Sequence, residues 1–140
     1  MFFRRGIASL ATLSLFMPTV FAESAPISRN GIEYSKAAGV PLYMDAGIPE
    51  DAGSFPAAII VHGGGWVRGN RRTDVAPLFN PLLEAGIAWF SIDYRLTNDI
   101  AQFGAGIEDV QNAIRYVKSH AAEFRIDPRR IALIGESAGG

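Results

Sequence analysis

The chain has 140 residues, of which 49% are apolar and 19% are charged, so it is long enough and apolar enough to fold as one domain. Lys and Arg number 13 and Asp and Glu number 14, and this net charge of −1 gives no support for a nucleic-acid binder or a polybasic membrane anchor. The absence of cysteine excludes a disulfide scaffold and a thiolate zinc site, and two histidines, His62 and His120, are too few for a multi-histidine metal site.

Residues 1–22 have the pattern of a secretory signal peptide. An Arg4-Arg5 pair forms a basic start, an uncharged apolar run covers 7–17, and small residues precede the expected cleavage site after Ala22. A helix that spans a bilayer needs about 20 apolar residues, so this run is too short to remain as a membrane anchor. We therefore expect an exported protein, periplasmic or secreted, whose folded part is 23–140. An uncleaved buried helix is the alternative interpretation.

The first part of 23–140 has the pattern of strands. Short segments over 32–35 and 40–46 predict an antiparallel hairpin, and a polar turn over 47–55 follows it. The continuous apolar run 57–61 predicts a strand that is buried on both faces of a sheet.

A helix is expected after the glycine-rich loop that follows this strand. Thr73 or Asp74 is suited to cap the helix, Pro81 is expected to kink it and Gly86 to end it. Its apolar side is formed by Leu78, Leu82 and Leu83.

The remaining chain alternates strand, helix and strand. Residues 87–92 predict a buried strand, 106–124 an amphipathic helix and 131–134 a third strand, while Asp127 is expected to cap a turn before that strand. The apolar stripe of the helix is formed by Ile107, Val110, Ile114, Val117, Ala121 and Phe124. This order predicts an α/β fold, a mostly parallel sheet with right-handed crossover helices.

The first motif that indicates chemistry is Gly135-x-Ser137-x-Gly139, directly after the last predicted strand. In this pattern a sharp turn lifts the serine hydroxyl clear of the sheet and holds the serine in a strained backbone conformation. Glycines at both flanking positions remove side chains that would collide in so tight a turn. A glycine- and serine-rich turn without chemistry is the alternative, and the preceding strand favours a nucleophile.

The second motif is HGGGW over 62–66, which follows the strand 57–61. Backbone N–H groups fixed in such a loop stabilise the oxyanion that acyl transfer generates. A purely structural turn is the alternative, and a phosphate-binding loop fits worse because neither GxGxxG nor GxxxxGK occurs. His62 precedes the glycines, so we interpret it as shaping the loop and not as a catalytic base.

Together with IDYRL at 92–96, DPRRI at 127–131 and GESAGG at 135–140, these motifs resemble those of the α/β-hydrolase fold. The likeness covers 32–140 and is to the esterase/lipase group, in particular to its hormone-sensitive-lipase-like and feruloyl- and acetyl-xylan-esterase-like members. It implies a carboxylesterase-type serine hydrolase that cleaves small-molecule esters through an acyl-enzyme. No metal and no organic cofactor is implied.

The resemblance also implies a role for each matching residue. Ser137 would be the nucleophile, and the backbone N–H groups of Gly64, Gly65 and Ala138 would form the oxyanion hole. Trp66 would line the substrate pocket, with a place in the core as the alternative.

The charged residues near these motifs are interpreted as structural. Polar residues at strand ends and on helix faces usually are, and those in question are Asp93, Arg95 and Asp109. The arginines of the loop would either meet an acidic substrate or, as we favour, face solvent; they are Arg68, Arg71 and Arg72.

In this family an acid and a histidine follow the serine. The chain given stops three residues after Ser137, and His120, on the predicted crossover helix, does not replace the missing base. We therefore expect a fragment, truncated after the nucleophile elbow, that is inactive by itself and leaves the strand 131–134 exposed. The alternatives are a prolyl-oligopeptidase-like serine peptidase and a non-catalytic or degenerate member of the fold.

Overall fold

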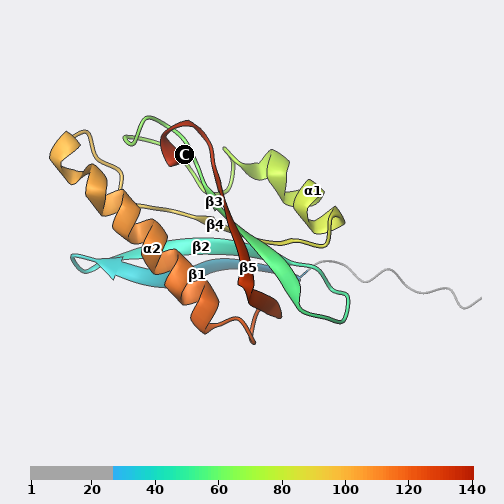
Figure 1. Cartoon of the computed structure of the whole chain (residues 1–140). Coiled ribbons are helices and arrows are strands. Elements are labelled where there is room, and N and C mark those ends of the chain that lie inside the picture. The colour runs from blue at the N-terminus through green and yellow to red at the C-terminus, as the bar shows by residue number, and fades with distance from the viewer. Residues whose placement is uncertain (1–26) are drawn as a thin grey trace, which may run out of the picture.

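The computed structural model describes residues 27–140, apart from the side chain of residue 100, so the predicted signal peptide over 1–22 lies outside the described residues. The strands are β1 (Ile27–Ala37), β2 (Val40–Ile48), β3 (Phe55–Val61), β4 (Ala88–Ile92) and β5 (Ile126–Gly135), and the α-helices are α1 (Phe79–Glu84) and α2 (Phe103–Ser119). They form one sheet in the order β1-β2-β4-β3-β5, with a helix on each face (Figure 1). Between residues 27 and 140, no helix is long and apolar enough to cross a membrane.

The sheet is mixed. The predicted hairpin is confirmed: β1 and β2 pair antiparallel, and both strands extend beyond the predicted segments. The predicted parallel strands are also confirmed, because β3 runs parallel to both β4 and β5. The hairpin joins them through an antiparallel pairing of β2 with β4. Because β3 and β5 are parallel neighbours, their carboxyl ends lie at the same end of the sheet.

The two central strands bury side chains on both faces, as their continuous apolar sequences predict. Ala88, Phe90 and Ile92 point toward α2, whereas Trp89 points toward α1. On the α2 side, the Phe90 ring meets the Phe124 ring edge-on at 5.0 Å between centroids. On the α1 side, Trp89 stacks on the ring of Phe79 at 3.9 Å.

The strand β5 lies at an edge of the sheet. It begins before the predicted 131–134 segment, and a register shift opposite Phe55 and Ala57 marks the predicted turn. There the Asp127 carboxylate accepts a hydrogen bond of 2.9 Å from the Arg129 amide, so Asp127 caps its own turn as predicted. Leu133 is 54% exposed, which agrees with the expectation that this strand is left open.

The predicted helix near Leu78 is shorter than expected. A 3-10 turn over Ala76–Leu78 precedes α1, and neither Thr73 nor Asp74 caps them, so the predicted cap is wrong. Asp74 instead accepts a hydrogen bond from the Asn70 amide. Pro81 does not kink the helix, because it lies in the first turn of α1, where its missing N–H has no intrahelical partner to lose.

The amphipathic helix is displaced from the predicted 106–124. Helix α2 begins at Phe103 and ends at Ser119, and its buried line runs through Asp109, Ala113 and Val117. Ile107 is 63% exposed, so its assignment to the apolar stripe is wrong. The helix is turned because the Asp109 carboxylate faces inward toward Arg95, which moves the neighbouring Ile107 outward.

Candidate active site

The turn after β5 has the backbone expected of a nucleophile elbow. Ser137 opens a 3-10 turn over Ser137–Gly139 with φ +51°, a left-handed conformation that non-glycine residues rarely adopt. Such strain persists only where the surroundings hold it, and it is concentrated at functional sites. The predicted strained conformation of Ser137 is therefore confirmed.

The flanking glycines are required by close backbone contacts. A Cβ atom on Gly135 would lie 2.2 Å from the carbonyl oxygen of Gly139. One on Gly139 would lie 2.3 Å from the carbonyl oxygen of Val61, at the end of β3. The second contact shows that the turn packs directly against the strand that leads into the glycine loop.

The loop after β3 also has a left-handed backbone. Gly64, Gly65 and Trp66 have φ of +116°, +62° and +64°, and the Arg68 amide donates a 3.2 Å hydrogen bond back to the Gly64 carbonyl. A Cβ atom on Gly64 would lie 2.1 Å from the Arg68 carbonyl oxygen. Within residues 27–140, the amides of Gly64, Gly65 and Ala138 donate to no protein acceptor. These three N–H groups therefore remain open to an acceptor from outside the described residues.

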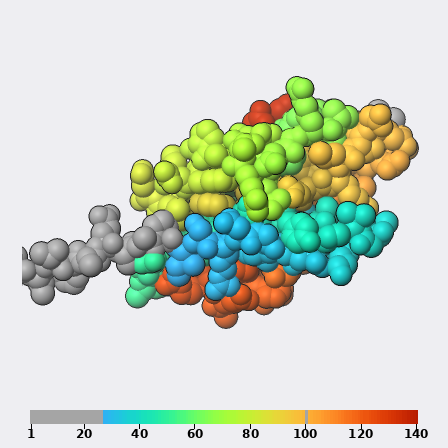
Figure 2. All heavy atoms as spheres, turned by 180° about the vertical axis from the view of Figure 1, so that it is seen from behind, coloured from blue at the N-terminus to red at the C-terminus, as the bar shows by residue number. Residues whose placement is uncertain are grey.

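Glu136 joins the two motifs, which are 73 positions apart in the chain. Its amide donates a 3.1 Å hydrogen bond to the Val61 carbonyl, and its carboxylate accepts a 3.0 Å bond from the Gly63 amide. In Figure 2 the end of the chain, in red, lies against the green atoms of the loop after β3. Sequence reasoning missed this contact, although an acidic side chain next to the serine was a visible signal.

His62 shapes the loop, as its position before the glycines predicts. The side chain is buried, and its Nδ1 lies 2.7 Å from the carbonyl oxygen of Gly63. Its ring stacks on Tyr94 at 4.6 Å, and the Tyr94 hydroxyl donates a 3.0 Å hydrogen bond to the His62 carbonyl. Burial, and then the charge of Glu136, raise the pKa of Tyr94 above its usual value, so this phenol stays a donor.

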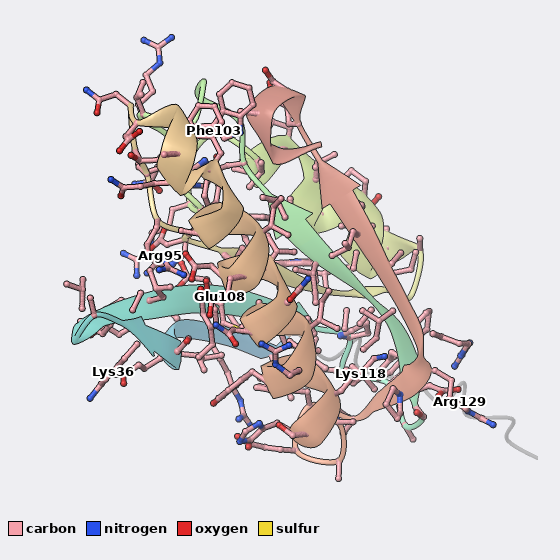
Figure 3. The ribbon with its side chains drawn as sticks, turned by 60° about the vertical axis from the view of Figure 1, so that its left-hand side comes forward. Lys36, Arg95, Phe103, Glu108, Lys118 and Arg129 are labelled. Carbon is pink, nitrogen blue, oxygen red and sulfur yellow. The ribbon has the colours of Figure 1, made fainter. Side chains whose placement is uncertain are left out.

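His120 lies away from the elbow. It follows the carboxyl end of α2, where its ring stacks on Tyr116 and its Nδ1 lies 2.8 Å from the Tyr116 carbonyl oxygen. Figure 3 shows Phe103 at the amino end of α2 and Lys118 toward the other end of the helix. Among the described residues, neither histidine forms a hydrogen bond with Ser137.

Trp66 lies on the surface and not in the core. Its side chain is 42% exposed and stacks on the ring of Phe103 at 4.7 Å between centroids. Its carbonyl accepts a 2.7 Å hydrogen bond from the Thr97 amide. This exposure contradicts the alternative prediction that Trp66 is a core residue.

The loop arginines differ from the prediction that they face solvent. Arg68 is exposed as expected, but the Arg71 side chain is only 12% exposed and pairs with both Asp45 and Asp93. Arg72 lies at the surface, with its Nε 2.8 Å from Asp45 Oδ2. The solvent-facing interpretation is therefore wrong for Arg71, because two carboxylates from neighbouring strands surround its guanidinium.

Arg95 and Asp109 are structural, as predicted, and Asp93 likewise makes an ion pair within the fold, with Arg71. The Arg95 guanidinium donates to both carboxylate oxygens of buried Asp109, and to Glu108 at 2.8 Å. Figure 3 shows Arg95 directed toward Glu108 on α2. These contacts attach the segment after β4 to α2.

Known proteins with similar sequences include a carboxylesterase and an AB hydrolase superfamily protein. The BD-FAE family model matches residues 44–140. The carboxylesterase NlhH of Mycobacterium tuberculosis is 39% identical over 87 residues, which cover 62% of this chain and 27% of that protein. An AB hydrolase superfamily protein of Schizosaccharomyces pombe is 33% identical over 130 residues, which cover 91% of this chain and 37% of that protein.

Solved structures show the same likeness. The thermophilic esterase Est2 of Thermogutta terrifontis superposes with a TM-score of 0.71 and 30% sequence identity, over 78% of this chain and 40% of that one. The chain thus spans less than half the length of each of these relatives. The predicted α/β-hydrolase fold of the esterase/lipase group is confirmed.

Proposed function

Because this chain belongs to the BD-FAE family and has the α/β-hydrolase fold, we propose that the protein is a serine hydrolase that cleaves small-molecule carboxylic esters. The proposal assigns Ser137 as the nucleophile. It assigns the amides of Gly64, Gly65 and Ala138 as the oxyanion hole, and Trp66 as part of the wall of the substrate pocket.

The chemistry proceeds in two halves. The Ser137 oxygen attacks the ester carbonyl carbon, a base takes its proton, and the negative charge on the carbonyl oxygen is stabilised by the three amides. The tetrahedral intermediate then collapses, the C–O bond to the alcohol breaks, and the alcohol leaves with the proton that the base returns. Water attacks the acyl-serine in the same way, which releases the acid and restores the Ser137 hydroxyl.

The base must be a residue other than the two histidines of this sequence. His62 is buried and its Nδ1 contacts its own loop, while His120 contacts the carboxyl end of α2. In the α/β-hydrolase order, acid and histidine follow the nucleophile. The base for Ser137 would therefore be a histidine that follows Ser137 in the order of the chain.

One observation supports the proposal most strongly. The Gly63 amide donates to the Glu136 carboxylate at 3.0 Å, and this bond places the glycine loop beside the serine turn. The parallel pairing of β3 with β5 already brings the two turns together, and within residues 27–140 three of their amides have no protein acceptor. An acyl-transfer site requires both the meeting and the free amides.

Parallel hydrolysis assays test the proposal. The protein expressed from its complete reading frame is expected to hydrolyse p-nitrophenyl acetate and to leave a peptide anilide intact. Ser137→Ala is expected to abolish the ester hydrolysis, and Ser119→Ala, a change at an exposed serine on α2, to preserve it. Cleavage of the anilide would instead favour a prolyl-oligopeptidase-like peptidase. Activity in neither assay would favour a non-catalytic member of the fold.

We also propose export of the protein through residues 1–22. The basic pair, the short apolar run and the small residues before position 23 support it. The mature protein is expected outside the cytoplasm with Glu23 as its first residue. An intact Met1 on the purified protein would contradict this proposal.

A further inference from the structure

Arg71 is a largely buried guanidinium, with its side chain 12% exposed, between two carboxylates. Its Nε lies 3.2 Å from Oδ1 of Asp45 on β2, and it pairs on its other side with Asp93, directly after β4. The ring of Tyr43 lies beside it, 6.0 Å from the guanidinium carbon. Arg71 thus connects the glycine loop to two strands of the sheet.

A stabilising role alone does not account for this arrangement. Burying charges costs desolvation, and a buried ion pair often adds no more to stability than apolar residues of similar volume. Asp45 also has other partners, because the Gly31 amide donates to it at 2.6 Å and the exposed Arg72 at 2.8 Å. A planar guanidinium with two fixed carboxylates does, however, define a position and an orientation.

What Arg71 positions is the end of the glycine loop. Its carbonyl accepts a 2.6 Å hydrogen bond from the buried Ser91 hydroxyl on β4, so its backbone is fixed along with its side chain. Two residues earlier, Gly69 packs against His62 so closely that a Cβ atom would lie 2.1 Å from Nδ1. The start and the end of the loop are therefore in contact, and the chain between them holds Gly64 and Gly65.

A displacement at Arg71 would be transmitted to these amides. The covalent chain from Gly65 to Arg71 is short, and its own hydrogen bonds, such as that from the Arg68 amide to the Gly64 carbonyl, leave it little freedom. Catalysis is sensitive to such shifts, since a misplacement of about 1 Å can cost ~10² in rate.

We propose that Arg71 is a positioning residue, whose contacts with Asp45 and Asp93 hold the amides of the glycine loop in the geometry that binds the oxyanion. The proposal rests on the esterase function proposed above. It assigns Arg71 no contact with substrate.

Three variants of the protein from its complete reading frame test this role. Arg71→Met keeps an apolar side chain and removes the guanidinium that pairs with Asp45 and Asp93. Arg71→Lys keeps the positive charge and loses the planar guanidinium. Arg72→Met is the matched control, because Arg72 binds the same Asp45 but its side chain is 55% exposed. For each variant, kcat and KM for p-nitrophenyl acetate are measured per serine titrated with a fluorophosphonate. Hydrogen exchange of the backbone amides in 63–69 is measured for the same variants.

Arg71→Met is expected to lower kcat by roughly 10- to 100-fold, with KM changed by no more than about twofold. Arg71→Lys is expected to fold and to lie between Arg71→Met and the wild type. The amides of 63–69 should exchange faster in Arg71→Met, and Arg72→Met should match the wild type in every measurement.

Two results would overturn the proposal. If Arg71→Met and Arg71→Lys melt at lower temperature but keep wild-type kcat and wild-type exchange over 63–69, Arg71 stabilises the fold and positions nothing. Equal losses in Arg71→Met and Arg72→Met would assign the effect to charge around Asp45. Failure of the wild type to hydrolyse the ester would contradict the proposed function, and the exchange comparison would still decide the role of Arg71.

Discussion

The two turns of the candidate site, 62–69 after β3 and 136–139 after β5, share a backbone design but differ in how they are held. Each contains a non-glycine residue in the left-handed region, Trp66 at φ +64° and Ser137 at φ +51°. The first turn is held by Thr97 and Tyr94 from other parts of the fold, and Arg71, two residues after the turn, pairs with Asp45 and Asp93. Among the described residues, the second is held by contacts with Val61, His62 and Gly63.

We infer from this difference that the glycine loop, the proposed oxyanion hole, is the better-held turn, against which the serine turn is placed. The strand β5 that carries the serine lies at the edge of the sheet, and on the α1 side an apolar groove of about 370 Å³ runs beside it. The strand that carries the glycine loop lies inside the sheet, between β4 and β5, and is buried on both faces. Disturbing the loop after β3 should therefore cost more than disturbing the contact between the turns.

Gly64→Val disturbs the loop after β3 most directly. Its Cβ would lie 2.1 Å from the Arg68 carbonyl at a φ of +116°, so the loop must change shape and displace its amides. We expect kcat to fall by ~10²–10³, the typical cost of one oxyanion donor, with a smaller rise in KM. Gly104→Ala is the control, because Gly104 on α2 has open space around it, and it should leave kcat unchanged. A wild-type kcat in Gly64→Val would place the oxyanion hole elsewhere.

Asp45→Asn removes the carboxylate that pairs with Arg71 at the end of the same loop. Burial alone would raise the pKa of Asp45, but the hydrogen bonds from Arg72 and the Gly31 amide and the charge of Arg71 lower it below its usual value. A carboxyl whose pKa is lowered by folding stabilises the fold above its unfolded pKa of about 3.9, and this stabilisation is lost as the pH falls through the folded pKa.

We therefore expect Asp45→Asn to lower the free energy of unfolding at pH 7 by about 3 kcal/mol, the typical cost of breaking a buried ion pair. The difference from the wild type should shrink as the pH falls below about 4. Urea unfolding at several pH values measures it, and Glu33→Gln, at an exposed carboxylate of β1, is the control. A deficit that does not change with pH would show that the Asp45 charge is not what is lost.

Substitution of Glu136 tests the contact between the two turns. Glu136→Ala removes the acceptor of the Gly63 amide, and we expect kcat/KM to fall about tenfold, as for one hydrogen bond to a charged group. Glu136→Gln keeps a side-chain oxygen that accepts the same bond, and its loss should stay within about threefold. Equal losses in both variants would mean that the negative charge matters and the bond does not.

Much of this architecture was predictable because it depends on local sequence. Continuous apolar runs identified β3 and β4, and the glycine spacings identified both turns and the strain at Ser137. The α1 region was misjudged because two prolines, Pro77 and Pro81, fit the first turns of two short helices as well as they fit one kinked helix.

The contacts that hold the site together were not predictable in the same way. Arg71, Asp45 and Asp93 lie on separate elements, and no periodicity in the sequence connects them. The inward side of α2 was misjudged because Asp109 is buried only through its pairing with Arg95. Such ion pairs are set by how strands, loops and helices pack together, which sequence patterns do not specify.

The most direct test of the central claim is the site of covalent reaction. The protein from its complete reading frame is treated with a fluorophosphonate, digested, and its peptides are identified by mass spectrometry. We predict one adduct, on Ser137, that is lost in Ser137→Ala and in protein unfolded before treatment, since an unactivated serine is a weak nucleophile. Equal labelling of Ser137→Ala, or an adduct on a serine outside the turn after β5, would contradict the assignment.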